Sequence, residues 1–136
     1  MNADTSRSRR SGPPLLHADV TEKIIGCFFD TYNELGAGYL EAVYQKALEI
    51  AFREAGLDAD SQPEVDVWFR GHKVGTYRPD FVIAGVVVVE LKAVTAMRDE
   101  HVMQLRHYLK ATATEVGLLL NFGSKPTFRR MVLERA

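Results

Sequence analysis

Cysteine and long apolar runs are nearly absent from the sequence. Cys27 is the one cysteine among 136 residues, so no internal disulfide can form, which agrees with a reducing cytosol. No stretch approaches the roughly 18 apolar residues that a membrane span needs, and residues 1–14 lack the apolar core of a secretion signal. We therefore expect a cytoplasmic protein without a membrane partner.

The remaining composition is that of an ordinary globular protein, with 46% hydrophobic and 26% charged residues. We expect one domain over residues 19–136, preceded by a disordered basic arm over residues 1–18. The net charge of −1 hides an asymmetry, because residues 19–66 carry a balance of −8 and residues 67–136 a balance of +5. A basic half fits a polyanion such as nucleic acid, although an uneven solvated surface explains these charges equally well.

Apolar periodicity predicts the order helix, helix, strands, helix, strands. The first helix carries Ile24 and Phe28 at helical spacing, and the predicted apolar face of the second contains Leu40, Val43 and Leu48. The predicted elements are a helix ending near Leu35, a helix over 39–55, strands over 64–70 and 73–77, a hairpin from Phe81 to Val89, a helix over 98–110, a strand over 116–120 and an edge strand over 128–133.

Three charged residues, Asp80, Glu90 and Lys92, lie at the ends of an otherwise apolar hairpin. Acids and lysines are rarely buried unless they are paired or bind a metal. A three-residue connection centred on Gly85 would place Asp80 opposite Glu90, with Lys92 on the same face. A two-residue turn, Ala84–Gly85, would instead send the two acids to opposite faces. A site at this hairpin therefore requires the odd connection.

Two opposed carboxylates repel one another, and a divalent cation relieves that repulsion. Hard oxygen ligands suit Mg²⁺ or Mn²⁺, and no cysteine or histidine cluster accompanies them to favour zinc. Lys92 then has a chemical use, because its ammonium group would orient the attacking water and stabilise charge on a phosphoryl oxygen. The competing interpretation is an ordinary hairpin in which Asp80 caps a strand and Glu90 and Lys92 lie at a solvated rim.

The sequences Pro79-Asp80 and Glu90-Leu-Lys92 resemble, in order and spacing, the core motif of the PD-(D/E)XK nuclease superfamily. This resemblance implies an α/β fold with a restriction-endonuclease-like core, in which helices flank a central mixed β-sheet. It extends over roughly residues 20–133, which is nearly the whole chain.

Two further elements carry the resemblance. Glu41 occupies the place of the acidic residue on the helix before the core hairpin, and the segment from Gly36 to Tyr44 around it is similar to the signature of the GxxExxY protein family. Gln104 and Tyr108 resemble the QxxxY motif that follows the lysine in exonuclease-type members. They are four apart on a predicted helix and therefore share a face.

The resemblance implies a metal-dependent nuclease that hydrolyses phosphodiester bonds in nucleic acid, with DNA favoured over RNA. Tyr108 is expected to contact the nucleic-acid backbone or to pack beside the site, and Arg78 to reach a phosphate or neutralise Asp80. The implied site comprises a Mg²⁺ or Mn²⁺ ion held by Asp80, Glu90 and Glu41, with Lys92 assisting the attacking water and Gln104 holding Lys92, the water or the phosphate.

The chain resembles a bare catalytic core, so substrate selection would use a homodimer or a partner protein. The alternative to an enzyme is a catalytically inactive nuclease-fold protein that binds nucleic acid or another protein. A third interpretation is a structural dimer joined through the strand at residues 128–133.

Overall fold

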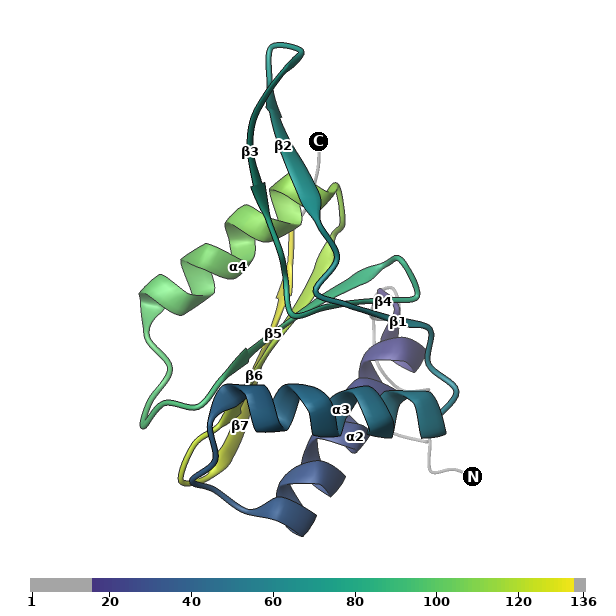
Figure 1. Ribbon diagram of the computed structural model, residues 1–136, viewed down its shortest axis with the longest axis vertical. Helices are drawn as coiled ribbons and strands as arrows, with labels where there is room; N and C mark the ends of the chain where they lie inside the picture. The colour runs from purple at the N-terminus through teal and green to yellow at the C-terminus, as the bar shows by residue number, and fades with distance from the viewer. Residues whose placement is uncertain (1–15, 134–136) are drawn as a thin grey trace, which may run out of the picture.

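The computed structural model describes residues 16–133 and has a mixed α/β architecture (Figure 1). The expected basic arm, residues 1–18, lies outside the described residues except for its last three, of which Ala18 begins the first helix. Among residues 16–133, every helix is too short or too polar to cross a lipid bilayer. The elements, in chain order, are α2 (Ala18–Leu35), α3 (Glu41–Glu54), β1 (Ala59–Ser61), β2 (Val65–Phe69), β3 (His72–Tyr77), β4 (Phe81–Ile83), β5 (Val87–Lys92), α4 (Asp99–Thr112), β6 (Val116–Phe122) and β7 (Pro126–Val132).

A five-stranded mixed sheet forms the centre of the domain, with the strand order β1-β4-β5-β6-β7. Strands β5 and β6 run parallel, and the other neighbours pair antiparallel. Helices α2 and α3 cover one face of the sheet and α4 covers the other (Figure 1). The predicted central mixed sheet flanked by helices is therefore confirmed.

The middle strands are buried on both faces because they are apolar along most of their length. In β5, Val87 and Val89 pack on the side of α2 and α3, whereas Val88 packs on the side of α4. Strand β6 is buried at every position. Continuous apolar runs of this kind are typical of strands covered on both faces. The alternation of side chains then directs Glu90 to the same face as Val88, the face that α4 covers.

The connection between β4 and β5 fixes the register on which the candidate site depends. Ile83 pairs with Val87, so three residues, 84–86, form the turn, and its middle residue, Gly85, has a φ of 69°. Glycine adopts this left-handed conformation without strain. Continued outward, the register places Asp80 opposite Glu90. The predicted three-residue connection is confirmed, and the two-residue alternative is excluded.

Two local predictions differ from the structure. Leu40 and Val43, expected on the apolar face of the second helix, are 79% and 41% exposed, because the helix begins at Glu41 and its buried positions start at Tyr44. Strand β1 was not predicted, since its residues Ala-Asp-Ser have no apolar alternation, and it lies at the edge of the sheet beside β4. The predicted C-terminal edge strand is confirmed as β7.

Strands β2 and β3 form a separate two-stranded sheet that projects away from the central one (Figure 1). They pair antiparallel from Val65 and Tyr77 at the base to Phe69 and His72 at the tip, with a bulge after Val67. Strand β2 also contacts α4. We call residues 64–78 the hairpin arm.

Candidate active site

Asp80 and Glu90 lie opposite one another, at the start of β4 and the end of β5, and each side chain accepts a hydrogen bond from the main chain of the other strand. The backbone N–H of Asp80 donates a hydrogen bond to Oε2 of Glu90 (3.0 Å), and the backbone N–H of Leu91 donates to Oδ2 of Asp80 (2.7 Å). These N–H groups are free for the side chains because the β4–β5 ladder stops at Phe81. Each carboxylate is therefore oriented by the main chain of the opposite strand.

The surroundings of these carboxyl groups disfavour two negative charges. Glu90 is 8% exposed, and burial, together with the charge of Asp80, raises its pKa to about 8. Burial also raises the pKa of Asp80, and the nearby charge of Glu41 adds to the rise. The backbone hydrogen bonds and the ammonium of Lys92 oppose both pKa shifts. Three carboxylates and one lysine thus form one electrostatic unit.

Glu41 is the first residue of α3, where the helix dipole favours a carboxylate. Its position depends on the preceding loop, which Tyr44 holds in place. The hydroxyl of Tyr44 donates to the carbonyl of Gly36 (2.6 Å) and accepts from the N–H of Tyr39 (3.3 Å). The ring of Tyr44 is fully buried and stacks on Phe122. Tyr44 therefore fixes the loop that leads into Glu41.

Gln45 is a site residue that was not predicted from the sequence. It is buried in α3, and its Nε2 donates to Oγ of Ser61 and to the carbonyl of Asp80, both at 3.0 Å. The N–H of Gln62 donates to the same carbonyl (2.9 Å). These bonds fix the main chain at Asp80 against α3 and β1. The available signal was a polar residue next to Tyr44 on the inward face of an amphipathic helix.

A buried asparagine holds the loop that follows Lys92, and it too was not predicted. Asn121 pairs with Lys92 in the parallel register of β5 and β6 and is 1% exposed. Its Oδ1 accepts from the N–H of Val94 and its Nδ2 donates to the carbonyl of Val94, both at 3.0 Å. The absence of a side chain at Gly123 permits this approach, because a Cβ there would lie 2.4 Å from the Val94 oxygen. Strand β6 thus sets the direction in which the chain leaves Lys92. The signal was an amide inside an apolar strand.

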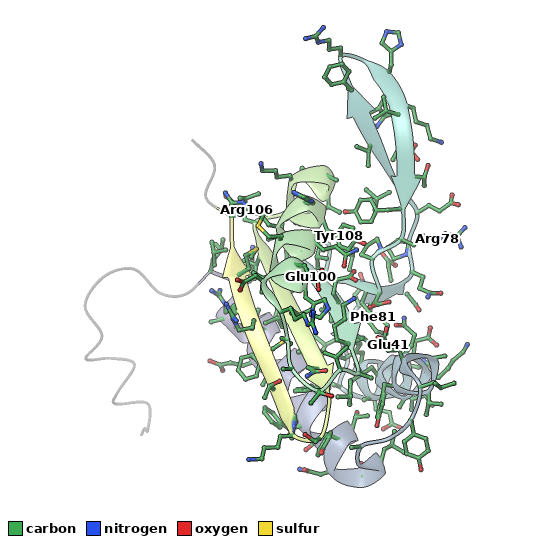
Figure 2. The ribbon with its side chains drawn as sticks, turned by 90° about the vertical axis from the view of Figure 1, so that its left-hand side faces the viewer. Glu41, Arg78, Phe81, Glu100, Arg106 and Tyr108 are labelled. Carbon is green, nitrogen blue, oxygen red and sulfur yellow. The ribbon has the colours of Figure 1, made fainter. Side chains whose placement is uncertain are left out.

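Tyr77 and Tyr108 form an aromatic pair beside the carboxylates. Their rings stack with centroids 4.2 Å apart, and the hydroxyl of Tyr77 donates to the backbone carbonyl of Tyr108 (2.8 Å). Burial is the main cause of the raised pKa of both phenols, and the charge of Glu90 contributes to each. Figure 2 shows Tyr108 on α4 and Glu41 on α3, with Phe81, the residue after Asp80, between them. The site therefore lies between the two helices.

Two predicted residues make contacts other than the expected ones. Gln104 is exposed, and its Nε2 donates to the hydroxyl of Tyr108 (2.8 Å), so its hydrogen bond goes to the tyrosine of the same motif. Arg78 is exposed and forms an ion pair with Glu64, with Nη2 and Oε2 2.7 Å apart. Arg78 thus pairs with Glu64 and not with Asp80 in this structure, and its expected contact with a phosphate stays a prediction.

A pocket of about 270 Å³ opens beside Asp80, and Glu41, Gln45 and Lys46 are among the residues that line it. Within residues 16–133, no three acidic, histidine or cysteine side chains are gathered into a complete metal cage. The donor set nevertheless fits Mg²⁺ or Mn²⁺, because such ions commonly use one or two carboxylates and complete their shell with waters and substrate phosphates. Asp80 and Glu90 supply two carboxylates, and their mutual repulsion favours a cation between them.

Two solved structures have a similar fold. The crystal structure of SSO0001 gives a TM-score of 0.58 at 19% sequence identity and covers 88% of this chain. The crystal structure of an alkaline exonuclease (LHK-Exo) from Laribacter hongkongensis gives a TM-score of 0.53 at 10% identity, again over 88% of this chain. The chain spans 60% of the length of the first and 72% of the second. At these identities the similarity establishes the fold alone.

Among curated protein sequences, none matches this chain significantly. The family model described as the PD-(D/E)XK nuclease superfamily matches residues 18–131, a range that contains both helices of the site and all of the central sheet except the last residue of β7. The chain therefore belongs to the PD-(D/E)XK nuclease superfamily.

Proposed function

We propose that the protein is a metal-dependent nuclease that hydrolyses phosphodiester bonds in nucleic acid, with DNA favoured over RNA. The observation that carries this proposal is the opposition of Asp80 and Glu90 in one register, with both carboxyl groups partly or fully withdrawn from water. Buried opposed carboxylates weaken a fold unless a cation joins them. Membership of a nuclease superfamily and the exonuclease among the fold neighbours support the same class of reaction.

We further assign the chain to the GxxExxY family, whose motif corresponds to Gly38, Glu41 and Tyr44. Each position has a physical reason in this fold. Gly38 has a φ of 106°, which side chains with a Cβ rarely adopt. Tyr44 closes the loop through its hydroxyl, and Glu41 follows at the start of α3. The motif thus delivers one carboxylate to the pocket beside Asp80.

In this proposal Asp80 and Glu90 hold a Mg²⁺ or Mn²⁺ ion, and Glu41 joins them directly or through water. The ion supplies Lewis acidity and lowers the pKa of a coordinated water. Lys92, at the end of β5, orients the attacking water and stabilises negative charge that develops on the phosphoryl oxygens. Its ammonium already counteracts the charges of Asp80 and Glu90.

The remaining predicted residues bind the substrate in this proposal. Tyr108 borders the carboxylates and contacts the nucleic-acid backbone, and Gln104 orients its hydroxyl. Arg78 is exposed at the base of the hairpin arm, where a phosphate can compete with Glu64 for its guanidinium. A homodimer or a partner protein contributes to substrate selection in this proposal.

The test is a cleavage assay on labelled single- and double-stranded DNA and RNA, with Mg²⁺, Mn²⁺ or a chelator. Asp80→Asn, whose side chain still accepts the bond from Leu91, and Lys92→Ala are each expected to lower cleavage about 100-fold or more while circular dichroism stays unchanged. Matched controls are Asp30→Asn and Lys125→Ala, at exposed positions outside the site. Full cleavage by both site variants would contradict the mechanism, and more cleavage of RNA than of DNA would contradict the preference.

The alternative is a nuclease-fold protein that binds nucleic acid without cutting it. Calorimetric titration with Mn²⁺ and gel-shift assays distinguish the two. A protein that binds oligonucleotides, shows no heat of cation binding and cleaves no substrate would be a binding module.

A further inference from the structure

The hairpin arm exposes large apolar side chains that the fold leaves uncovered. Trp68, Phe69 and Val74 are 62%, 55% and 61% exposed. A two-stranded hairpin has no second layer in which to bury such groups, and clustered exposed apolar residues mark binding surfaces. The arm extends well beyond the central sheet and α4 in both views (Figures 1 and 2). The arm is therefore accessible to a ligand from several sides.

Basic side chains lie beside these aromatic rings. Lys73 lies directly across from Trp68, and His72 lies across from Phe69. The guanidinium of Arg70 lies 4.8 Å from the centroid of the Phe69 ring. Aromatic faces bordered by cations are the chemistry that binds single-stranded nucleic acid, because bases stack on the rings while the cations contact phosphates.

Both acidic residues of the arm are paired with a base, so Arg70 is the cation of residues 64–78 that forms no ion pair. Asp66 forms an ion pair with Lys73 (3.3 Å), and Glu64 forms one with Arg78 (2.7 Å). Both carboxylates lie toward the base of the arm, whereas Arg70 lies in its terminal turn. The tip therefore presents positive charge next to apolar rings.

The base of the arm joins the candidate active site. Tyr77, the last residue of β3, stacks on Tyr108, and both phenols sense the charge of Glu90. At about 3.3 Å per residue, the five steps from Tyr77 to His72 span about 17 Å. That length corresponds to about five nucleotides of a stacked strand. Phe69 lies on the same face of the hairpin as Tyr77, whereas Trp68 lies on the opposite face. A strand that stacks on Phe69 thus leads toward the carboxylates, and Trp68 offers a second ring across the edge of the arm.

We propose that the hairpin arm is a stacking platform for an unpaired nucleic-acid strand that enters the site of Asp80 and Glu90. This inference rests on the proposed nuclease function and specifies its substrate as nucleic acid with a single-stranded segment. A continuous duplex hides the faces of its bases, so exposed Trp68 and Phe69 rings have no partner there. An unpaired strand offers those faces whatever its sequence.

Trp68 is the one tryptophan of the chain and therefore reports directly on stacking. The full-length Asp80→Asn protein, kept in chelator so that nothing is cleaved, is titrated with oligothymidylates, with duplexes that carry overhangs of increasing length and with a duplex closed at both ends. Tryptophan emission is expected to be quenched by single strands and by overhangs of about five nucleotides or more. Absence of quenching by every single strand, or equal quenching by the closed duplex, would overturn the proposal.

Substitutions at the exposed rings give a second measurement. Trp68→Leu and Phe69→Leu are expected to leave the unfolding temperature unchanged and to weaken single-strand binding, measured by fluorescence anisotropy, by about 5- to 150-fold each. Phe128→Leu, at an exposed aromatic on β7, is the matched control. Unchanged single-strand affinity in both arm variants contradicts the stacking platform.

The two proposals fail separately. If the wild-type protein binds and quenches with single strands but never cleaves, the arm proposal stands and the nuclease proposal falls. If the protein cleaves and Trp68→Leu does so with an unchanged KM, the arm proposal alone falls. A change from dimer to monomer in Trp68→Leu, with oligonucleotide affinity unchanged, would show a protein interface and would also overturn it.

Discussion

Glu90 occupies a position where a neutral side chain would suit the fold better. Its carboxyl group is almost fully buried, faces Asp80, and has a pKa raised to about 8. Burial of a charge costs free energy that Lys92 offsets only in part. Such a residue is typical of a functional site, where stability is given up for chemistry.

Glu90→Gln tests whether the charge of Glu90 lowers stability while it serves the reaction. The amide oxygen can still accept the hydrogen bond from the N–H of Asp80, but the charge is gone. In chelator and alkaline buffer, where the wild-type carboxyl is ionised, the free energy of unfolding should rise by about 1–2 kcal/mol, measured by chemical denaturation. Cleavage should be lost. The control Glu34→Gln, at an exposed position, should change the free energy of unfolding by less than about 0.5 kcal/mol. A lower free energy of unfolding in Glu90→Gln would show that the charge of Glu90 does not destabilise the fold.

The connection between α2 and α3 shows how a short segment places a functional group. Two glycines at positive φ turn the chain between the helices. Tyr44, one turn into α3, reaches back to the carbonyl of Gly36 while its ring stays in the core. The start of α3, and with it Glu41, is therefore tied to the end of α2.

Tyr44→Phe removes this tie and keeps the stacked ring. Loss of the hydroxyl leaves the carbonyl of Gly36 without that donor, so the free energy of unfolding should fall by about 1–2 kcal/mol. Glu41 should become less well positioned, and the cleavage rate should fall about tenfold or more. Tyr39→Phe, a neighbouring exposed tyrosine, is the control for both measurements. Full activity in a destabilised Tyr44→Phe would separate the loop from the chemistry.

The assembled domain gathers its site from segments that are distant in sequence. Helix α3, the start of β4, the end of β5 and helix α4 each contribute a group around Asp80. A cation that binds this cluster binds the folded state alone and must therefore stabilise it.

Mn²⁺ should accordingly raise the unfolding temperature of the wild-type protein. At a concentration 100-fold above the dissociation constant, the stabilisation amounts to about 2.7 kcal/mol. Asp80→Asn should show a much smaller shift, and the exposed-site variant Asp30→Asn should behave like the wild type in differential scanning calorimetry. An equal shift in Asp80→Asn would assign the binding to another part of the protein.

The local features of the fold were predictable from the order of residues. Apolar periodicity indicated both helices of the first layer, the arm, the core hairpin, α4 and the last two strands. Gly85 allowed a two-residue or a three-residue connection. A site at the hairpin required the three-residue connection, which the register confirms. Apolar periodicity and turn preferences depend on a few neighbouring residues, so both can be predicted from the sequence. Strand β1 was not predicted because its three residues have no apolar periodicity.

The supports of the site depend on contacts between distant segments. Gln45 reaches the carbonyl of Asp80 from another helix, Asn121 holds the loop after Lys92 from another strand, and Tyr77 stacks on Tyr108 across the base of the arm. Arg78 likewise pairs with Glu64, a contact that the sequence did not indicate. Periodicity states which face of an element is buried but not which element will cover it. The sequence by itself therefore identified the charged residues at the centre of the site. Only the packing of the helices on the sheet determined which groups surround these residues, and hence their pKa values.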